Sequence, residues 1–135
     1  MSATPVITES SSLIEATVSQ YFESFSSGDF GTTASLFDVE GVLYPPFDQS
    51  VTGSQAIASY LEAEARGMQV ELLKQSVTLL AEREYQCSVV GTVHTGLFSV
   101  NVNWEFVLSS KAKIRSVKVK LLATLQDLLA IKQTS

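Results

Sequence analysis

Residues 98–106 alternate strictly between apolar and polar side chains. The polar positions are Ser99, Asn101, Asn103 and Glu105, and between them stand the apolar residues Phe98, Val100, Val102, Trp104 and Phe106. Successive side chains of a β-strand point to opposite faces of its sheet, so this pattern predicts a strand with one apolar and one polar face. The apolar face has to be covered by a second layer, which limits the chain to a small set of layered folds.

Helical patterns near the N-terminus supply that second layer. Apolar residues recur there with the spacing of one helical face, at Ile14, Val18, Tyr21, Phe22 and Phe25. Ser11 or Ser12 can cap this helix at its start, and Gly28 can end it. We therefore expect Tyr21 to point inward with the apolar residues.

Two more helices are expected before the chain becomes rich in strands. Asp29 can cap a short helix whose buried side carries Phe30, Ala34 and Phe37. Ser54 can cap the other helix, which Gly67 ends and whose apolar face carries Ile57, Tyr60 and Leu61. Between the two helices, residues 41–47 predict a short strand that the prolines 45 and 46 interrupt.

Four β-rich runs follow, at about residues 68–80, 84–95, 97–109 and 113–122. An amphipathic closing helix is expected at Leu125, Leu128 and Leu129. Helices first and adjacent strands afterwards indicate an α+β fold, with the helices packed on one face of a curved, mostly antiparallel sheet. We expect residues 1–10 to form a disordered tail and residues 11–135 a single domain.

Charge and composition exclude several classes of function. The net charge is -5, which opposes binding to the phosphate backbone of nucleic acid. A single cysteine and a single histidine among 135 residues argue against a metal site built from those ligands. The sequence contains no run of 18 or more apolar residues and no signal-peptide pattern, so we expect a soluble, cytoplasmic protein.

Tyr21 and Trp104 are the two large side chains of the expected interior that carry a polar tip. A buried hydroxyl or indole N–H needs an acceptor, because an unpaired buried donor costs about 1–3 kcal/mol. Each donor can meet a backbone carbonyl or a water molecule. Alternatively, both can donate to one oxygen of a ligand, and local spacing does not decide between these two interpretations.

Several short blocks occur in collinear order along the chain: Tyr21-Phe-Glu-Ser-Phe-Ser-Ser-Gly-Asp-Phe30, Leu43-Tyr-Pro-Pro-Phe47, Val51-Thr-Gly53 with Ala56-Ile57, Val90-Gly-Thr-Val-His-Thr95, Asn103-Trp-Glu-Phe106, and Lys120-Leu-Leu-Ala-Thr124 with Asp127-Leu-Leu129. In this order they resemble the C-terminal domain of the orange carotenoid proteins, and more closely the free-standing homologues of that domain in cyanobacteria. The resemblance runs from about Leu13 to Ile131.

This resemblance implies a cone with the fold of nuclear transport factor 2 that holds one ring of a ketocarotenoid, canthaxanthin or echinenone. The keto oxygen of that ring would accept hydrogen bonds from Tyr21 and Trp104. The matching positions of the apolar wall are Val93, Phe98, Val119 and Leu121, together with Met68 and Val70. The resemblance also implies a carotenoid carrier that forms a homodimer around one shared pigment, exchanges it with helical carotenoid proteins, and touches membranes transiently to take it up.

The sequence departs from the full-length photoprotective proteins in three respects. No helical domain precedes the matching region, so we expect no photoprotective quenching by this chain alone. Gly96 and Leu97 replace a proline and a tryptophan, which removes an aromatic wall near the ring. The stretch between Phe98 and Trp104 is four residues shorter than in that family, which shortens a hairpin.

Two other functions stay open, a protein-interaction module and an isomerase or cyclase, because the same fold hosts both. An enzyme of that kind needs an interior carboxylate as its base. The inward strand positions contain none, and we expect Asp38, Glu40 and Asp48 to be solvated. We therefore predict that the protein is not an enzyme and uses no metal.

Cys87 shares strand parity with Val89 and Val93, which predicts a buried thiol on the inner face of the sheet. Such a thiol would not be needed for pigment binding. The alternative is an intermolecular disulfide between two copies, which requires the end of the strand to open and expose the sulfur.

Overall fold

The structure is a computed structural model, and it describes residues 9–81 and 83–122. These residues form three helices and six strands. The helices are α1 (Glu9–Ser27), α2 (Phe30–Ser35) and α3 (Ser54–Glu64). The strands are β1 (Phe37–Tyr44), β2 (Val51–Thr52), β3 (Gln69–Ala81), β4 (Glu84–His94), β5 (Ser99–Ser109) and β6 (Ile114–Leu121). The closing helix expected around Leu125 and the expected tail at residues 1–8 lie outside the described residues.

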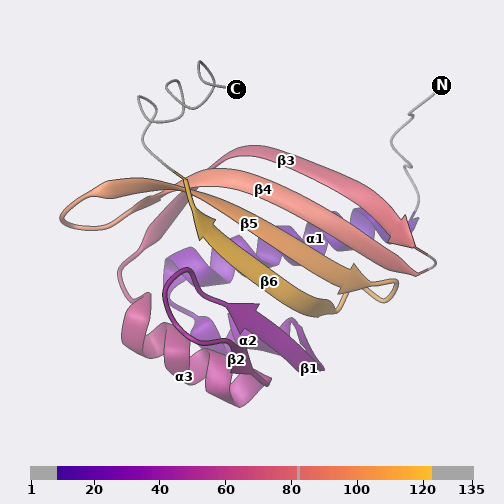
Figure 1. The fold of residues 1–135 in the computed structure, drawn as a ribbon, viewed down its shortest axis with the longest axis horizontal. Coiled ribbons are helices and arrows are strands. Elements are labelled where there is room, and N and C mark those ends of the chain that lie inside the picture. The colour runs from indigo at the N-terminus through magenta and orange to yellow at the C-terminus, as the bar shows by residue number, and fades with distance from the viewer. Residues whose placement is uncertain (1–8, 82, 123–135) are drawn as a thin grey trace.

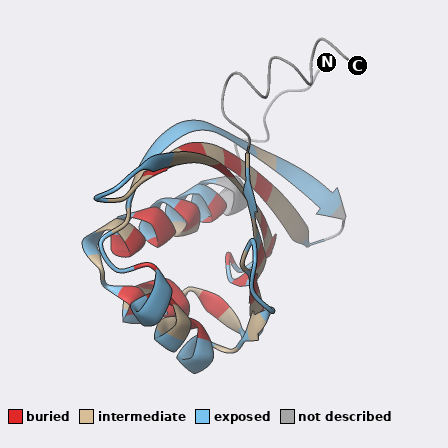
Figure 2. Cartoon of the chain, turned by 60° about the vertical axis from the view of Figure 1, so that its left-hand side comes forward, coloured by how far each residue is buried: buried red, intermediate tan, exposed pale blue. Residues whose placement is uncertain are grey.

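The strands form one sheet in the order β2-β1-β6-β5-β4-β3. Every pairing is antiparallel except the one between β1 and β6, which is parallel. The sheet curves around the helices, and its buried residues face them (Figure 1, Figure 2). The predicted α+β cone, with helices on one face of a curved and mostly antiparallel sheet, is therefore confirmed.

Helix α1 buries the side that its sequence predicts. Ile14, Val18, Tyr21, Phe22 and Phe25 are all at most 8% exposed. The helix begins at Glu9, before both of the predicted caps, Ser11 and Ser12, so Glu9 and Ser10 are helical. It ends at Ser27 because Gly28 adopts a φ of 80°, a left-handed conformation that glycine takes without steric cost.

The starts of the two other helices differ in chemistry. Asp29 caps α2 as predicted, because its side chain accepts a hydrogen bond from the backbone N–H of Thr32 at 3.3 Å. Ser54 was expected to cap α3, but it is the first residue inside that helix, and the cap is Gly53 with no side-chain hydrogen bond. The φ of Gly53 is 92°, which a serine at the cap would adopt only with strain.

Strand β1 is longer than the sequence predicts. It begins at Phe37, which was assigned to the buried side of α2, and it ends at Tyr44 before the two prolines. Its parallel partner is the last strand, so that Phe37 stands beside Ile114 and Leu43 beside Val117. Because β1 lies between β6 and β2, it is an interior strand of the sheet, and the two-residue β2 forms the edge.

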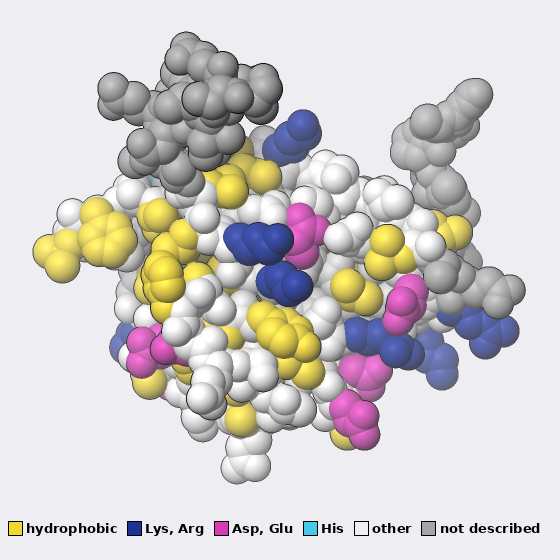
Figure 3. All heavy atoms as spheres, viewed as in Figure 1, with side chains coloured by type: hydrophobic (Ala, Val, Ile, Leu, Met, Phe, Trp, Pro, Cys, Tyr) yellow, Lys and Arg dark blue, Asp and Glu magenta, His cyan; other side chains and the backbone are white. Residues whose placement is uncertain are grey.

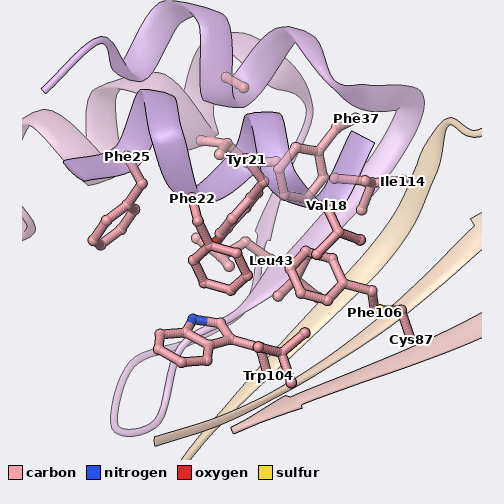
Figure 4. Close-up of a cluster of buried hydrophobic side chains, with 14 of the residues drawn as sticks. Val18, Tyr21, Phe22, Phe25, Phe37, Leu43, Cys87, Trp104, Phe106 and Ile114 are labelled. Carbon is pink, nitrogen blue, oxygen red and sulfur yellow. The ribbon is translucent and has the colours of Figure 1, made fainter. Parts of the chain in front are cut away.

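Aromatic rings from α1 and β5 meet at the centre of the core (Figure 4). The ring of Tyr21 meets Phe106 at 90° with centroids 5.0 Å apart, and it stacks on Phe25 at 6.2 Å. Such edge-to-face and offset contacts are favourable beyond the area that they bury. The aromatic side chains of the core thus gather where α1 faces β5, close to the expected ligand site.

Candidate functional site

One largely apolar cavity of about 250 Å³ lies between α1, α3 and the inner face of the sheet. Its lining residues are Tyr21, Phe25, Leu43, Pro45, Pro46, Phe47, Asp48, Tyr60, Leu61, Glu64, Ala65, Met68, Val93, Val100, Val102, Trp104, Val119 and Leu121. The inner part is buried. The exposed lining residues form its mouth, namely Pro46, Phe47, Asp48, Glu64 and Leu121.

Tyr21 enters the cavity from the side of the helices. Its ring is held on two sides by Phe25 and Phe106, and the residue is 1% exposed. Burial raises the pKa of the Tyr21 hydroxyl above its ordinary value, because the phenolate would lose its hydration. The hydroxyl is therefore a neutral hydrogen-bond donor throughout the physiological range of pH.

Trp104 faces it from the sheet. The residue lies in the middle of β5 between Val89 of β4 and Val119 of β6, and it is 3% exposed. Its ring meets the ring of Phe22 from α1 almost at right angles. In Figure 4 the indole nitrogen lies on the edge of the ring that is turned toward α1.

Neither donor is satisfied by the part of the chain that the structure describes. Across residues 9–81 and 83–122, the Tyr21 hydroxyl and the Trp104 indole N–H have no hydrogen-bond acceptor. Both side chains line the same cavity, whose other buried lining residues are apolar. Two unpaired donors in an apolar enclosure are costly, at about 1–3 kcal/mol each. They are complementary to a mostly apolar ligand with an acceptor oxygen.

The mouth carries the polar groups of the cavity. The Tyr60 hydroxyl donates to a carboxylate oxygen of Asp48 at 2.6 Å, which joins α3 to the loop after β1. Desolvation raises the pKa of Tyr60, and the hydrogen bond to Asp48 and the charges of Asp48 and Glu64 raise it further. Asp48 and Glu64 are both exposed, as predicted for Asp48. Asp38 and Glu40 lie in β1 and do not line the cavity.

The structure brings most of the predicted site residues together. Tyr21, Trp104, Val93, Val119, Leu121 and Met68 all line the cavity. Phe98 does not, because it lies in the turn between β4 and β5 and is 61% exposed. Val70 does not either, since it packs beside Phe22 and Ser26 on the outer side of α1, where its N–H donates to the Ser26 hydroxyl at 3.1 Å. Cys87 is fully buried on the inner face of β4, away from the cavity lining.

Several lining residues were missed by the sequence reasoning. Those from α1, α3 and the loop after β1 include Phe25, Leu43, Phe47, Tyr60 and Leu61. The signal for the loop was present in the Pro45-Pro46-Phe47 block, which interrupts β1 and turns the chain across the cavity. The residues of α3 carried only an ordinary helical pattern, which does not distinguish a cavity wall from a packed core.

No helix among the described residues is long and apolar enough to cross a membrane. The same residues contain no group of three or more His, Cys, Asp or Glu side chains placed to hold a metal ion.

Comparison with known proteins places this geometry in a family. The chain is 32% identical over 119 residues to the orange carotenoid-binding protein of Synechocystis sp., a match that covers 84% of this chain and 37% of that protein. It is similar to the structure of the orange carotenoid protein of Anabaena (Nostoc) sp. binding canthaxanthin, with a TM-score of 0.77, 28% identity, and coverage of 85% of this chain and 38% of that one. The chain thus spans just over a third of these relatives.

A more distant likeness concerns the fold alone. SalBIII, an epoxide hydrolase/cyclase-like enzyme of pyran ring formation in salinomycin, has a TM-score of 0.67 at 17% identity, over 84% of this chain and 94% of that one. The model of the nuclear transport factor 2 (NTF2) domain matches residues 13–123, which include every described helix and strand in whole or in large part. The predicted resemblance is confirmed, and the chain belongs to the nuclear transport factor 2 domain family.

Proposed function

We propose that this protein binds a ketocarotenoid and holds one of its rings in the cavity, with the keto oxygen accepting hydrogen bonds from Tyr21 and Trp104. The observation that carries this proposal is a pair of buried donors that face one apolar cavity and that no acceptor among the described residues 9–81 and 83–122 satisfies. The relative whose structure was determined with canthaxanthin supports the choice of ligand. Canthaxanthin and echinenone both offer a ring ketone.

The size of the cavity determines how much of such a ligand is enclosed. A cavity of about 150 Å³ holds benzene, so the volume of about 250 Å³ found here suits one methyl-substituted ring. The polyene chain would leave through the mouth, past Phe47 and Leu121. Most of the ligand would therefore lie outside the cavity of a single copy.

Burial provides affinity and the two donors provide selectivity. Each hydrogen bond contributes only about 0.5–1.5 kcal/mol to binding. A carotene without a ketone would instead leave both donors buried and unpaired, at a cost of about 1–3 kcal/mol each. The protein should therefore discriminate against β-carotene more strongly than the gain from either hydrogen bond would suggest.

A carrier role follows from the part of the ligand that protrudes. An apolar polyene in water needs a second cover, which a second copy of this chain or a membrane can supply. We accordingly propose a homodimer that shares one carotenoid, takes it from membranes and delivers it to helical carotenoid proteins in the cytoplasm.

Catalysis is the weaker alternative, although SalBIII has the same fold. A general base in a dry cavity needs a buried carboxylate with a raised pKa. The carboxylates in the described lining are Asp48 and Glu64, and both are exposed at the mouth. The lining therefore favours binding over proton transfer.

The test is expression of the protein in hosts that make either canthaxanthin or β-carotene, followed by absorption spectra of the purified protein. We expect a coloured protein with a red-shifted band from the first host and a nearly colourless one from the second. A colourless protein from both hosts would contradict carotenoid binding. Equal uptake of both pigments would contradict recognition of the ketone by Tyr21 and Trp104.

A further inference from the structure

The turn between β4 and β5 presents two apolar side chains to solvent. Leu97 is 92% exposed and Phe98 is 61% exposed. Figure 3 shows hydrophobic side chains gathered at the left end of the molecule, the end where this turn projects in Figure 1. Such a cluster at a projecting turn calls for an explanation, because large exposed apolar patches mark interaction sites.

The turn adjoins the cavity. Val93 and Val100 are cross-strand partners on either side of the turn, and both line the cavity. Phe47, which is 85% exposed, belongs to the mouth of the same cavity. A surface that covered Leu97 and Phe98 would thus lie beside the opening through which a ligand enters.

Thr95 satisfies part of the polar backbone of the turn from within. The Thr95 hydroxyl accepts the N–H groups of Leu97 at 3.1 Å and of Phe98 at 3.0 Å, and it donates to the carbonyl of Phe98 at 3.0 Å. The Thr95 N–H donates to that carbonyl as well, at 2.9 Å. Each unpaired backbone group costs several kcal/mol in an apolar phase, so these four hydrogen bonds lower the cost of moving the backbone beside Leu97 and Phe98 out of water.

The part of the β4–β5 hairpin nearest the turn has no Lys, Arg, Asp or Glu to desolvate. Residues 85–104 contain no Lys, Arg, Asp or Glu, although such residues make up 17% of the chain. The only histidine, His94, lies between the Ser99 hydroxyl at 2.7 Å and a carboxylate oxygen of Glu71 at 3.1 Å. Shallow insertion limited to residues 95–98 therefore buries no Lys, Arg, Asp or Glu side chain of the tip itself, and Glu71 beside His94 sets the depth at which a charge would meet the lipid.

We propose that residues 95–98 form a membrane-docking tip, which inserts Leu97 and Phe98 into a lipid bilayer and brings the mouth of the cavity against the lipid. This inference rests on the proposed function for its purpose, because docking there would give a membrane-dissolved pigment a path into the cavity. Attraction comes from the apolar side chains and not from charge, since the net charge is -5 and the tip carries no Lys or Arg. Uncharged phosphatidylcholine is thus a sufficient surface.

The test is flotation of the pigment-free protein with phosphatidylcholine vesicles. We expect the wild type to float with the vesicles, and the double variant Leu97→Ser/Phe98→Ser to lose about tenfold or more in partitioning. The matched control is Leu79→Ser/Leu80→Ser. These two leucines are 55% and 48% exposed and lie near the C-terminal end of β3, at the end of the sheet away from residues 95–98. This control should float like the wild type, and anionic lipid should not strengthen binding.

A second variant tests the role of the backbone. Thr95→Val makes the tip more apolar but removes the hydroxyl that satisfies two N–H groups. We expect it to partition less than the wild type, whereas simple hydrophobicity would make it partition more. Docking at this tip is overturned if the wild type does not float, if the Leu97→Ser/Phe98→Ser variant floats equally well, or if the control loses as much.

Two further measurements separate this inference from the proposed function and from self-association. Canthaxanthin offered in detergent micelles should load into the tip variant as into the wild type, while transfer from vesicles should slow about tenfold or more. Normal loading from micelles without vesicle binding would overturn the docking tip alone, and vesicle binding without any loading would overturn the proposed function alone. A tip variant that became monomeric without any change in flotation would identify the tip as a contact between copies and overturn membrane docking.

Discussion

The rings of Phe22 and Trp104 meet edge to face, with their centroids 4.8 Å apart and their planes at 81°. Phe22 follows Tyr21 directly in α1, so one turn of this helix supplies one donor of the cavity and orients the other (Figure 4). The two donors are therefore coupled through the helix. A change at Phe22 should therefore affect ligand binding, although Phe22 does not line the cavity.

Replacement of Phe22 by leucine should loosen Trp104 and weaken pigment binding, because the edge of the Phe22 ring fixes the indole plane. Trp104 is the only tryptophan, so its fluorescence reports directly on the site. We expect a shifted emission maximum and lower affinity for canthaxanthin. Phe30→Leu is the control, since Phe30 is equally deep but contacts Phe25 and not Trp104. It should destabilise the fold without moving the emission.

Tyr21→Phe and Trp104→Phe each remove one proposed donor and keep an aromatic ring. Each should shift the bound absorption band to the blue, because less electron density is drawn toward the ketone. Each should weaken canthaxanthin binding by about 0.5–1.5 kcal/mol, which titration of the pigment's absorption band measures. The double variant should no longer discriminate against β-carotene. Unchanged spectra in both single variants would contradict the assignment.

The stability of the protein should fall above about pH 10 in a way that depends on Tyr21. Burial raises the pKa of Tyr21 in the folded state, whereas the unfolded chain loses this proton near pH 10. Above that pH the unfolded state binds fewer protons, so the free energy of unfolding decreases by up to about 1.4 kcal/mol per pH unit from this group. Denaturant titrations of wild type and Tyr21→Phe measure it. The free energy of unfolding of the wild type minus that of Tyr21→Phe should be constant below about pH 9 and should decrease above about pH 10.

Gly91→Ala should disturb the site from the inner face of β4, beside Trp104. A Cβ atom at residue 91 would lie 2.6 Å from the carbonyl oxygen of Glu71 and 3.3 Å from Trp104. The backbone of β3 cannot yield as a side chain would, so β4 and Trp104 must move. We expect a loss of about 1–3 kcal/mol in unfolding free energy together with weaker pigment binding. Gly96→Ala is the control, because its Cβ would meet no atom within 4 Å.

Cys87 should be chemically silent in the folded protein. The residue is fully buried, and burial is the main reason that the pKa of its thiol rises to about 12, with smaller contributions from Glu15 and Glu105. The thiolate needed for disulfide formation is therefore scarce at neutral pH. Thiol titration should detect Cys87 only after unfolding, and Cys87→Ala should bind pigment normally. A covalent dimer of the native wild type on a non-reducing gel would revive the intermolecular disulfide.

The strands could be predicted closely because alternation is a local property of the chain. The third run was expected at residues 97–109 and is found at Ser99–Ser109. The same pattern predicted an inward side chain at Phe98, and this prediction was wrong, because Phe98 lies in the turn before β5 begins at Ser99. The Thr95 hydroxyl takes the N–H of Phe98 and turns the backbone before the strand begins. A side-chain bond to the backbone thus decided the direction of Phe98.

The cavity could be predicted only where it is built from strands and from α1. The inward positions of Trp104 and Tyr21 follow from period and register. The contributions of Tyr60 and Phe47 depend on how α3 and the loop after β1 lie over the sheet, and no local spacing specifies that arrangement. The same limit applies to Val70. It pairs with the cavity residue Val93, but its own side chain packs beside α1 and does not reach the cavity.

The parallel pairing of β1 with β6 also sets the order of events in the life of the chain. On the ribosome β1 emerges early, yet its neighbour Ile114 appears only when nearly all other strands have been made. Contacts between such distant segments form late and slowly. Because Leu43 of β1 and Val119 of β6 both line the cavity, the binding site comes into existence only with the last strand. A ligand can therefore bind there only once β6 has been made, and not while β1 to β5 alone have left the ribosome.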